Sequence, residues 1–174
     1  MLSTTANKIT LFRIVLIPVF LVLAYLGYGI AAFAVYVIAC LSDAADGYIA
    51  RHYNQITVFG KFMDPLADKM LVLAAMCWFI DSGVMPGWAV AVVIFREFAV
   101  SGLRLIAAQR GVVIAAARSG KLKTACTMVG LGAMLLFPAS RPVCLVCIVL
   151  ILATTVWSGI EYFSKNWNVL LQDE

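Results

Sequence analysis

Long apolar runs separated by short polar breaks make up most of this chain. Residues 14–39 carry no charge, and the break at Gly27-Tyr28-Gly29 predicts one helix over about residues 10–27 and a second over about 30–52. Further breaks fall at Asp81-Ser82-Gly83, Pro86-Gly87, Gly111 and Pro138. Because such residues end helices, they predict four more, over about residues 61–80, 87–110, 121–137 and 142–163.

The first apolar run also has features of a secretory signal. Lys8 and Arg13 precede it, and Ala32-Phe33-Ala34 resembles a cleavage site. However, the apolar character continues without a break into the second predicted helix, so we expect no cleavage.

Composition indicates that these helices lie in a membrane. Hydrophobic residues make up 64% of the 174 residues and charged residues 13%, whereas a soluble domain is about half apolar and about a quarter charged. This balance excludes a soluble globular enzyme, a disordered chain and a nucleic-acid-binding protein. At about 20 residues per span, we expect an all-α integral membrane protein with six transmembrane helices, forming a single domain over residues 1–174.

Basic residues predict the orientation in the membrane. The formal net charge is +4, and eleven of the 13 Lys and Arg residues fall at one set of predicted helix ends. Arg141 falls at the opposite ends and Arg96 inside the fourth helix. By the positive-inside rule, both termini and the connections between helices two and three and between four and five are cytoplasmic. The eleven are Lys8, Arg13, Arg51, Lys61, Lys69, Arg104, Arg110, Arg118, Lys121, Lys123 and Lys165.

Acidic residues crowd the same ends of helices two and three. Asp43 and Asp46 lie on one face of the second helix, which also carries Gly47, Ala50 and Arg51. Gly60, Asp64 and Asp68 are spaced by four and form a stripe on the third helix. Because the connection between the helices is short, the two faces can meet in an active-site cavity that opens to the cytoplasm.

Four carboxylates in a membrane need compensation. Each ionised group costs several kcal/mol there, and the four repel one another. Either the carboxylates are protonated, or they share hard cations such as Mg²⁺ or Mn²⁺ through oxygen ligands. A cluster with such cations suits two-metal phosphoryl transfer. A membrane metal-ion transporter is the alternative from another class, although an ion path would need ionisable groups on both sides of the midplane.

The acidic segment resembles a known signature. Asp43-Ala-Ala-Asp46-Gly47-Tyr-Ile-Ala50-Arg51, then eight residues and Gly60-Lys-Phe-Met-Asp64-Pro-Leu-Ala-Asp68, fills every position of D-x2-D-G-x2-A-R-x8-G-x3-D-x3-D. This is the pattern of the CDP-alcohol phosphotransferases. The resemblance implies a six-helix core in a bacterial cell membrane, a homodimer and a metal-dependent enzyme of phospholipid biosynthesis.

The resemblance also implies roles for individual residues. Asp43, Asp46 and Asp64 match metal ligands, and Asp68 matches both a ligand and the general base. A second set matches contacts to CDP-diacylglycerol: Asn7, Thr10, Asp46, Gly47, Ala50, Arg51, Thr57 and Gly60. The implied reaction is attack by the 1-hydroxyl of an acceptor such as sn-glycerol 3-phosphate on the β-phosphorus of CDP-diacylglycerol, which releases CMP.

Looser cues bear on the acceptor. Asn7-x2-Thr10-Leu-Phe-Arg13, Arg96-Glu97, Ser101-x2-Arg104 and Gly120-Lys121-Leu-Lys123-Thr124 favour glycerol 3-phosphate. Phosphatidylglycerol, as in cardiolipin synthases, and inositol phosphate stay open as alternatives. The predicted acceptor-phosphate ligands are Arg104, Arg118, Lys121 and Lys123, whereas Arg110 is interpreted as a flanking residue.

The remaining charged residues are expected to have structural roles. Arg96 and Glu97 lie deep in the fourth helix, and adjacent residues of a helix do not face each other, so each is expected to have its partner elsewhere. Glu161 is expected to make a structural polar contact. The sequence leaves open the acyl-chain preference, the dimer interface and the choice between Mg²⁺ and Mn²⁺.

Overall fold

The computed structural model of the chain describes residues 5–52, 58–112, 114–115 and 117–167. Within these ranges, the structure describes the backbone but not the side chains of residues 5–6, 44–52, 58–62, 64–65 and 68. The described part consists of helices and the turns that connect them, with no strand. It contains six helices: α1 (Thr5–Tyr25), α2 (Gly29–His52), α3 (Val58–Asp81), α4 (Gly87–Gln109), α5 (Arg118–Leu136) and α6 (Arg141–Asn166).

The helix ends fall close to the predicted breaks. Gly27, Gly83 and Gly111 follow α1, α3 and α4 with φ angles of 81°, 71° and 72°, a left-handed conformation that glycine adopts without a steric penalty. The starts differ more. Helix α1 begins at Thr5 rather than near residue 10, because the polar residues before its apolar run also belong to the helix.

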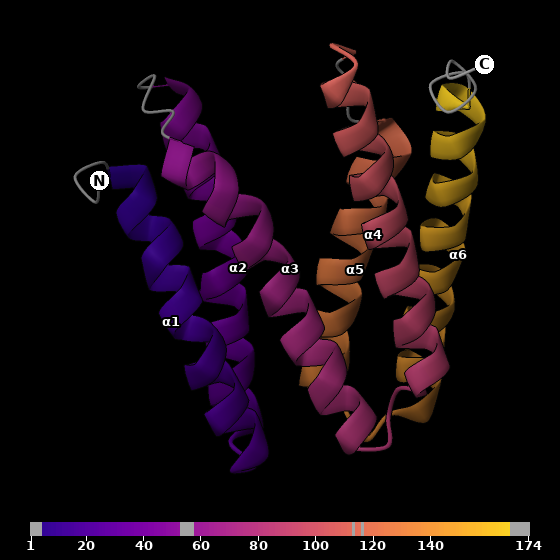
Figure 1. The fold of residues 1–174 in the computed structure, drawn as a ribbon. Helices are drawn as coiled ribbons and strands as arrows, with labels where there is room; N and C mark the ends of the chain where they lie inside the picture. Colours follow the sequence, from indigo (N-terminus) through magenta and orange to yellow (C-terminus); the bar gives the residue numbers. More distant parts are fainter. Residues whose placement is uncertain (1–4, 53–57, 113, 116, 168–174) are drawn as a thin grey trace.

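The helices lie side by side and alternate in direction (Figure 1). Helix α1 packs against α2 and α3, and α5 packs against α2, α3 and α6, while α4 packs against α6. At the upper end in Figure 1 lie the start of α1, the end of α2, the start of α3 and the end of α4, together with the start of α5 and the end of α6. The fold therefore brings Asp43 of α2, Arg104 of α4 and Lys123 of α5 toward the same end of the molecule.

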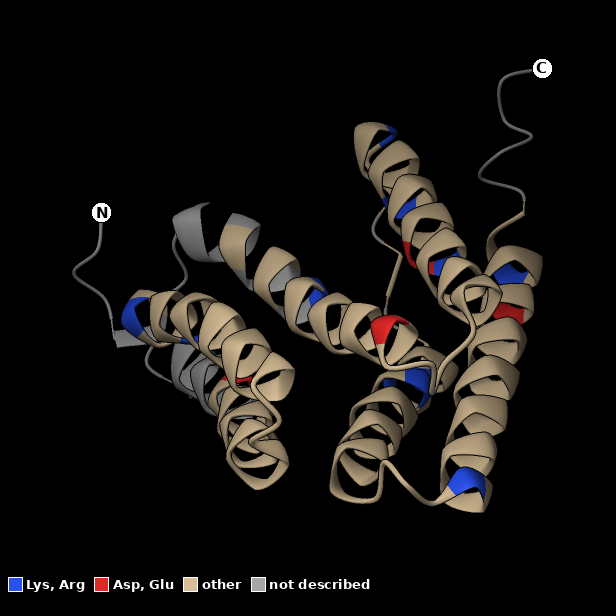
Figure 2. Cartoon of the chain, turned by 90° about the horizontal axis from the view of Figure 1, so that it is seen from below, with Lys and Arg blue, Asp and Glu red and all other residues tan. Residues whose placement is uncertain are grey.

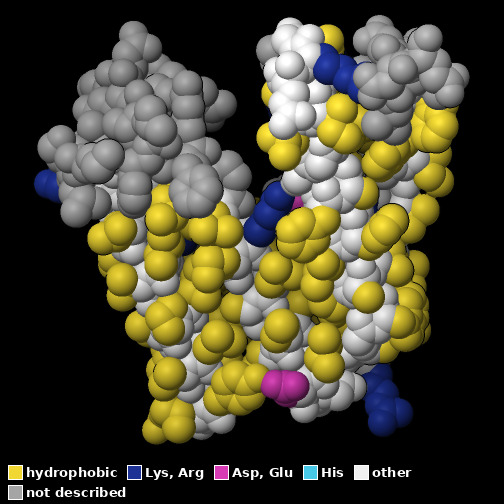
Figure 3. Space-filling view, viewed as in Figure 1, with side chains coloured by type: hydrophobic (Ala, Val, Ile, Leu, Met, Phe, Trp, Pro, Cys, Tyr) yellow, Lys and Arg dark blue, Asp and Glu magenta, His cyan; other side chains and the backbone are white. Residues whose placement is uncertain are grey.

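The surface of the described part is more apolar than that of a soluble protein. Large hydrophobic side chains point outward on every helix, including Ile30, Phe95, Phe98, Val129 and Ile160, and Phe95 is 76% exposed. Figure 3 shows hydrophobic side chains as a broad band across one face. Monomeric soluble proteins rarely expose continuous apolar areas of this kind, so the apolar exterior is typical of a membrane-associated protein.

Charged residues are sparse along the ribbon (Figure 2). Helix α6 carries none between Arg141 and Glu161. Two helical stretches, Asn7–Tyr25 and Arg141–Asn166, are long and apolar enough to cross a membrane by length and composition.

The interior has an apolar centre with polar groups toward the upper end. Buried side chains from all six described helices form the apolar core, among them Phe20, Tyr36, Leu71, Phe79, Val93, Met134 and Ile151. Buried polar side chains lie on α1, α5 and α6, and they include Asn7, Thr10, Arg13, Lys123 and Thr155. Buried polar groups need partners, and the contacts of these groups define the candidate site.

Candidate functional site

The four predicted carboxylate residues belong to two consecutive helices, near the end of α2 and the start of α3, which lie at the same end of the molecule (Figure 1). Asp43 and Asp46 belong to α2, and Asp64 and Asp68 belong to α3. Among these four, the structure describes the side chain of Asp43. Its Oδ1 accepts a hydrogen bond from Nη1 of Arg13 at 2.9 Å, and 30% of the Asp43 side chain stays exposed. A carboxylate that is partly exposed can bind a cation in addition to its guanidinium partner.

Several other predicted ligands have side chains outside the described residues. These are Asp46, Gly47, Ala50, Arg51, Gly60, Asp64 and Asp68 on the helices, and Thr57 between them. Within the described part of the chain, no three His, Cys, Asp or Glu side chains lie together. The metal-ligand and nucleotide-contact roles of this set therefore stay predictions.

Helix α1 presents a polar stripe to the same region. Asn7, Thr10 and Arg13 are all buried, and they continue toward the N-terminus the buried face that Ile17 and Phe20 form farther along the helix. Spacings of three and four residues place all five side chains on the side of α1 that packs against α2 and α3. Asn7 and Thr10 were predicted from the family resemblance to contact the nucleotide, and their burial beside α2 and α3 is compatible with that role.

From the sequence, Arg13 was expected only to occupy a motif position and to act as a basic flanking residue. The structure buries its side chain completely and pairs it with Asp43. Asn7, Thr10 and Arg13 follow one another at a spacing of three residues. This helical spacing is the signal that could have assigned Arg13 to the buried face.

A second polar cluster joins α4 to α5. Nζ of Lys123 and Nη1 of Arg96 both donate to Oε1 of Glu97, at 2.7 Å and 3.0 Å. Glu97 was expected to have a partner on another helix, and Lys123 of α5 is that partner. The expectation that Arg96 and Glu97 do not meet was wrong, because the long arginine side chain bends round the helix to the neighbouring carboxylate.

Two glycines border the Arg96 side chain. A Cβ atom on Gly159 of α6 would lie 3.3 Å from Cγ of Arg96, and one on Gly120 of α5 would lie 3.7 Å from Nη2. The contact at Gly159 would be tight, whereas the one at Gly120 would be an ordinary van der Waals contact, so the close approach of α6 to Arg96 of α4 favours a small residue at Gly159. Nearby, Nζ of Lys69 on α3 donates to Oγ of Ser101 on α4 at 2.7 Å.

The predicted acceptor ligands fall into two environments. Arg104, Arg118 and Lys121 are exposed, whereas Lys123 is buried and held by Glu97. Nε of Arg104 donates to the hydroxyl of Tyr162 on α6 at 2.6 Å. In Figure 3 the face is hollowed beside the upper half of α4, with basic and acidic side chains at the floor of the hollow.

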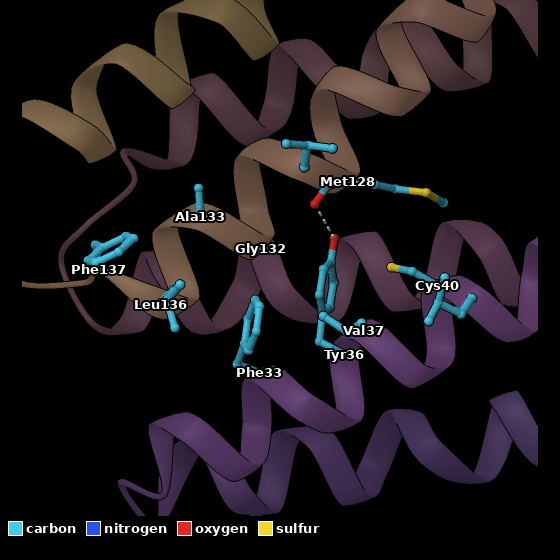
Figure 4. Close-up of a pocket in the computed structure, with 11 residues that line it drawn as sticks. Phe33, Tyr36, Val37, Cys40, Met128, Gly132, Ala133, Leu136 and Phe137 are labelled. Atoms are coloured by element: carbon cyan, nitrogen blue, oxygen red, sulfur yellow. Dashed lines mark hydrogen bonds between the residues drawn. The ribbon is translucent and has the colours of Figure 1, made fainter.

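An apolar cavity of about 380 Å³ lies between α2 and α5 (Figure 4). Phe33, Val37, Gly132 and Leu136 are among its lining residues, and the Tyr36 hydroxyl donates to the carbonyl of Met128 at 3.1 Å. Among the described residues, its lining contains no Asp, Glu, Lys or Arg. This cavity therefore does not suit a charged, water-soluble acceptor, which needs cations around its phosphate.

Glu161 makes the polar contact that was expected of it, because it pairs with Lys165 one turn along α6. This exposed pair lies beside Tyr162, at the end of α6 that faces α4.

Comparison with known proteins identifies the family. The sequence model of the family described as CDP-alcohol phosphatidyltransferase matches residues 3–157. The chain belongs to this family. The match spans α1 to α5 and most of α6, and it includes both halves of the acidic motif. The membership predicted from the motif is thereby confirmed.

Individual relatives in this phosphatidyltransferase family are similar over nearly their whole length. A CDP-diacylglycerol–glycerol-3-phosphate 3-phosphatidyltransferase of Bacillus subtilis is 43% identical, over 94% of this chain and 95% of the relative. Proteins of the same name from Salmonella typhimurium and Pseudomonas fluorescens are 37% and 36% identical. They align with 94% and 96% of this chain and with 94% and 92% of their own lengths.

Proposed function

We propose that this chain transfers the phosphatidyl group of CDP-diacylglycerol to sn-glycerol 3-phosphate. In the reaction the acceptor's 1-hydroxyl oxygen forms a bond to the β-phosphorus, and the bond from that phosphorus to the oxygen of CMP breaks. Asp68 takes the hydroxyl proton as general base. The products are CMP and phosphatidylglycerophosphate, which stays in the membrane.

The observation that carries this proposal is the near full-length similarity to relatives of that name, combined with a complete motif. The Bacillus subtilis relative aligns with 94% of this chain, and all eight motif positions hold the expected residue. The motif contains none of the proposed acceptor ligands. A relative that uses another acceptor can therefore carry the same motif, and the choice of acceptor needs separate evidence.

The donor set fits hard divalent cations. Asp43, Asp46, Asp64 and Asp68 offer carboxylate oxygens, the ligands that Mg²⁺ and Mn²⁺ prefer, and the Asp43 carboxylate keeps part of its surface exposed beside Arg13. We assign two metal ions to these four residues. When bound, the ions neutralise the diphosphate and stabilise the leaving CMP.

Nucleotide binding is assigned to the residues around this cluster. Asn7 and Thr10 approach it from the buried face of α1, and Asp46, Gly47, Ala50, Arg51, Thr57 and Gly60 complete the proposed CDP-diacylglycerol contacts. Arg13 supports them by orienting Asp43 through the 2.9 Å ion pair. A carboxylate that is held in one orientation loses less conformational freedom when a ligand binds.

Acceptor binding is assigned to basic residues of α4 and α5. Arg104, Arg118 and Lys121 are exposed and can reach a phosphate that enters from solution. Lys123 contributes from a buried position, where Glu97 already compensates its charge. Phosphatidylglycerol and inositol phosphate are the competing acceptors. The exposed arginines favour a small acceptor with a phosphate monoester over phosphatidylglycerol, and the similarity to the named relatives favours glycerol 3-phosphate over inositol phosphate.

All six helices are proposed to span a bacterial cell membrane, with both termini in the cytoplasm. Support comes from the apolar exterior and from the common end shared by the starts of α1, α3 and α5. Eleven of 13 basic residues belong to that end, which the positive-inside rule places in the cytoplasm. A homodimer is proposed from the family resemblance.

A direct assay tests the proposal. Purified protein in mixed micelles would receive CDP-diacylglycerol, Mg²⁺ and one acceptor at a time: glycerol 3-phosphate, phosphatidylglycerol, inositol phosphate or serine. Of the four acceptors, we expect only glycerol 3-phosphate to support CMP release, with phosphatidylglycerophosphate as the product. Faster turnover with another acceptor would overturn the acceptor assignment, and no CMP release with any acceptor would favour the transporter interpretation.

A further inference from the structure

Arg104 and Tyr162 form a contact between α4 and α6 that the proposed reaction does not yet explain. Nε of Arg104 lies 2.6 Å from the Tyr162 hydroxyl, and its guanidinium carbon lies 5.2 Å from the centroid of the Tyr162 ring. The two residues are 58 positions apart in the sequence. No sequence motif connects them.

Tyr162 is a rigid partner in this contact. Its side chain is 2% exposed and forms a small buried cluster with Val100 and Leu103 of α4. On its own helix, the Asn166 side-chain amide donates to the Tyr162 carbonyl at 2.8 Å. The phenol hydroxyl is therefore held at a defined place between α4 and α6.

Arg104, in contrast, is an exposed side chain with many rotamers. The Tyr162 hydroxyl accepts a hydrogen bond from Nε of Arg104, the guanidinium nitrogen that is bonded to the aliphatic part of the side chain. Among the described residues, no protein acceptor binds the terminal Nη1 or Nη2 group of Arg104. These two nitrogens form a fork that can bind two oxygens of one phosphate group.

We propose that Tyr162 is a positioning residue that orients Arg104 toward the phosphate monoester of the acceptor. The assignment rests on the proposed function, in which Arg104 binds that phosphate. By holding Nε, the Tyr162 hydroxyl selects one arginine rotamer before the acceptor arrives. The Arg104 side chain then loses its conformational entropy already in the free protein. Acceptor binding does not have to order the side chain, so the affinity for the acceptor is higher.

Tyr162→Phe tests the proposal because it removes the hydroxyl and keeps the buried ring. We expect the KM for glycerol 3-phosphate to rise about 3- to 10-fold, because the free Arg104 side chain must then be ordered when the acceptor binds. The kcat and the KM for CDP-diacylglycerol should stay within about 2-fold of wild type, since neither depends on this contact. A lowered unfolding midpoint with unchanged acceptor kinetics would show a structural role and overturn the proposal.

Tyr36→Phe is the matched control. Tyr36 is also 2% exposed, but its hydroxyl binds the Met128 carbonyl between α2 and α5. Removing it should leave the KM for glycerol 3-phosphate at the wild-type value. An equal rise in both variants would mean that any lost buried hydroxyl disturbs the site, and it would overturn the specific role of Tyr162.

A double-mutant cycle separates this inference from the proposed function. In an Arg104→Ala background, Tyr162→Phe should cause no further rise in the KM for glycerol 3-phosphate. If Arg104→Ala itself leaves that KM unchanged, the proposed acceptor site fails. If Arg104→Ala raises the KM but Tyr162→Phe does not, the positioning role alone fails.

Arg104→Lys keeps the proposal testable if Tyr162→Phe does not fold. Lysine has no Nε–H at the equivalent position, so the Tyr162 hydroxyl cannot orient its ammonium in the same way. We expect a higher KM for glycerol 3-phosphate with a normal KM for CDP-diacylglycerol. An unchanged acceptor KM in Arg104→Lys would overturn the positioning role.

Discussion

Arg13 of α1 and Asp43 of α2 form an ion pair of 2.9 Å in which the guanidinium is completely buried. The pair ties α1 to the first carboxylate of the acidic motif. A buried guanidinium depends on its carboxylate partner, because loss of one partner leaves an uncompensated charge. Arg13 is therefore expected to act on both the stability of the fold and the orientation of Asp43.

Arg13→Met should weaken the fold and the site together. Methionine fills the space without a charge, so Asp43 loses its partner. We expect the free energy of unfolding to fall by about 1.5–3 kcal/mol, as for a hydrogen bond to a charged group, with weaker CDP-diacylglycerol binding. Thermal unfolding in detergent and a nucleotide-binding assay measure the two effects, and Arg13→Lys should restore part of each. Unchanged nucleotide binding in Arg13→Met would limit the pair to a structural role.

Chelation tests the assignment of metal ions to the four aspartates. EDTA should abolish CMP release, and added Mg²⁺ or Mn²⁺ should restore it. Ca²⁺ should restore it poorly, because its larger and looser coordination does not suit a two-metal clamp. Full turnover in excess chelator would contradict the metal assignment.

Asp68→Asn distinguishes the general base from the other ligands. Asparagine keeps one oxygen ligand but does not accept a proton, so turnover should fall at least about 10²-fold while CDP-diacylglycerol still binds. Asp43→Asn should also weaken metal and nucleotide binding. Binding isotherms and initial rates would be compared for the two variants. Equal losses of nucleotide affinity would remove the support for Asp68 as the base.

Arg104→Ala tests the acceptor site directly. Losing a charge-assisted contact to phosphate should raise the KM for glycerol 3-phosphate roughly 10- to 100-fold, with little change in the KM for CDP-diacylglycerol. Arg110, one position beyond the end of α4, offers a nearby arginine for comparison. Arg110→Ala should change neither KM by much. Unaltered acceptor kinetics in Arg104→Ala would move the acceptor site elsewhere.

Glu97 and Lys123 should behave as a coupled pair. Glu97→Gln leaves the buried Lys123 ammonium with a weaker partner, so the unfolding midpoint should fall. Adding Lys123→Met to Glu97→Gln should recover part of that loss, because the uncompensated charge is then gone. Strictly additive losses in thermal unfolding would indicate that the 2.7 Å contact does not couple the two residues.

The sequence by itself determined the family and most of the helical pattern. Six helices follow from apolar runs and from glycine and proline breaks, since these signals act within a few residues. The acidic motif is equally local, because its eight positions lie within Asp43–Asp68 and span two consecutive helices. Such features depend on backbone conformation and on composition, which neighbouring residues decide.

The pairing of residues between helices was decided by the tertiary structure alone. The helical period tells which face a residue occupies, but not which helix packs against that face. Arg13 meets Asp43, Lys123 meets Glu97 and Arg104 meets Tyr162 because α1 packs on α2, α5 lies beside α4, and α4 packs on α6. A charged group at a buried position needs a partner, and for Arg13 and Lys123 that partner lies on another helix. The physical reason is that packing, rather than local sequence, determines which partner lies within reach.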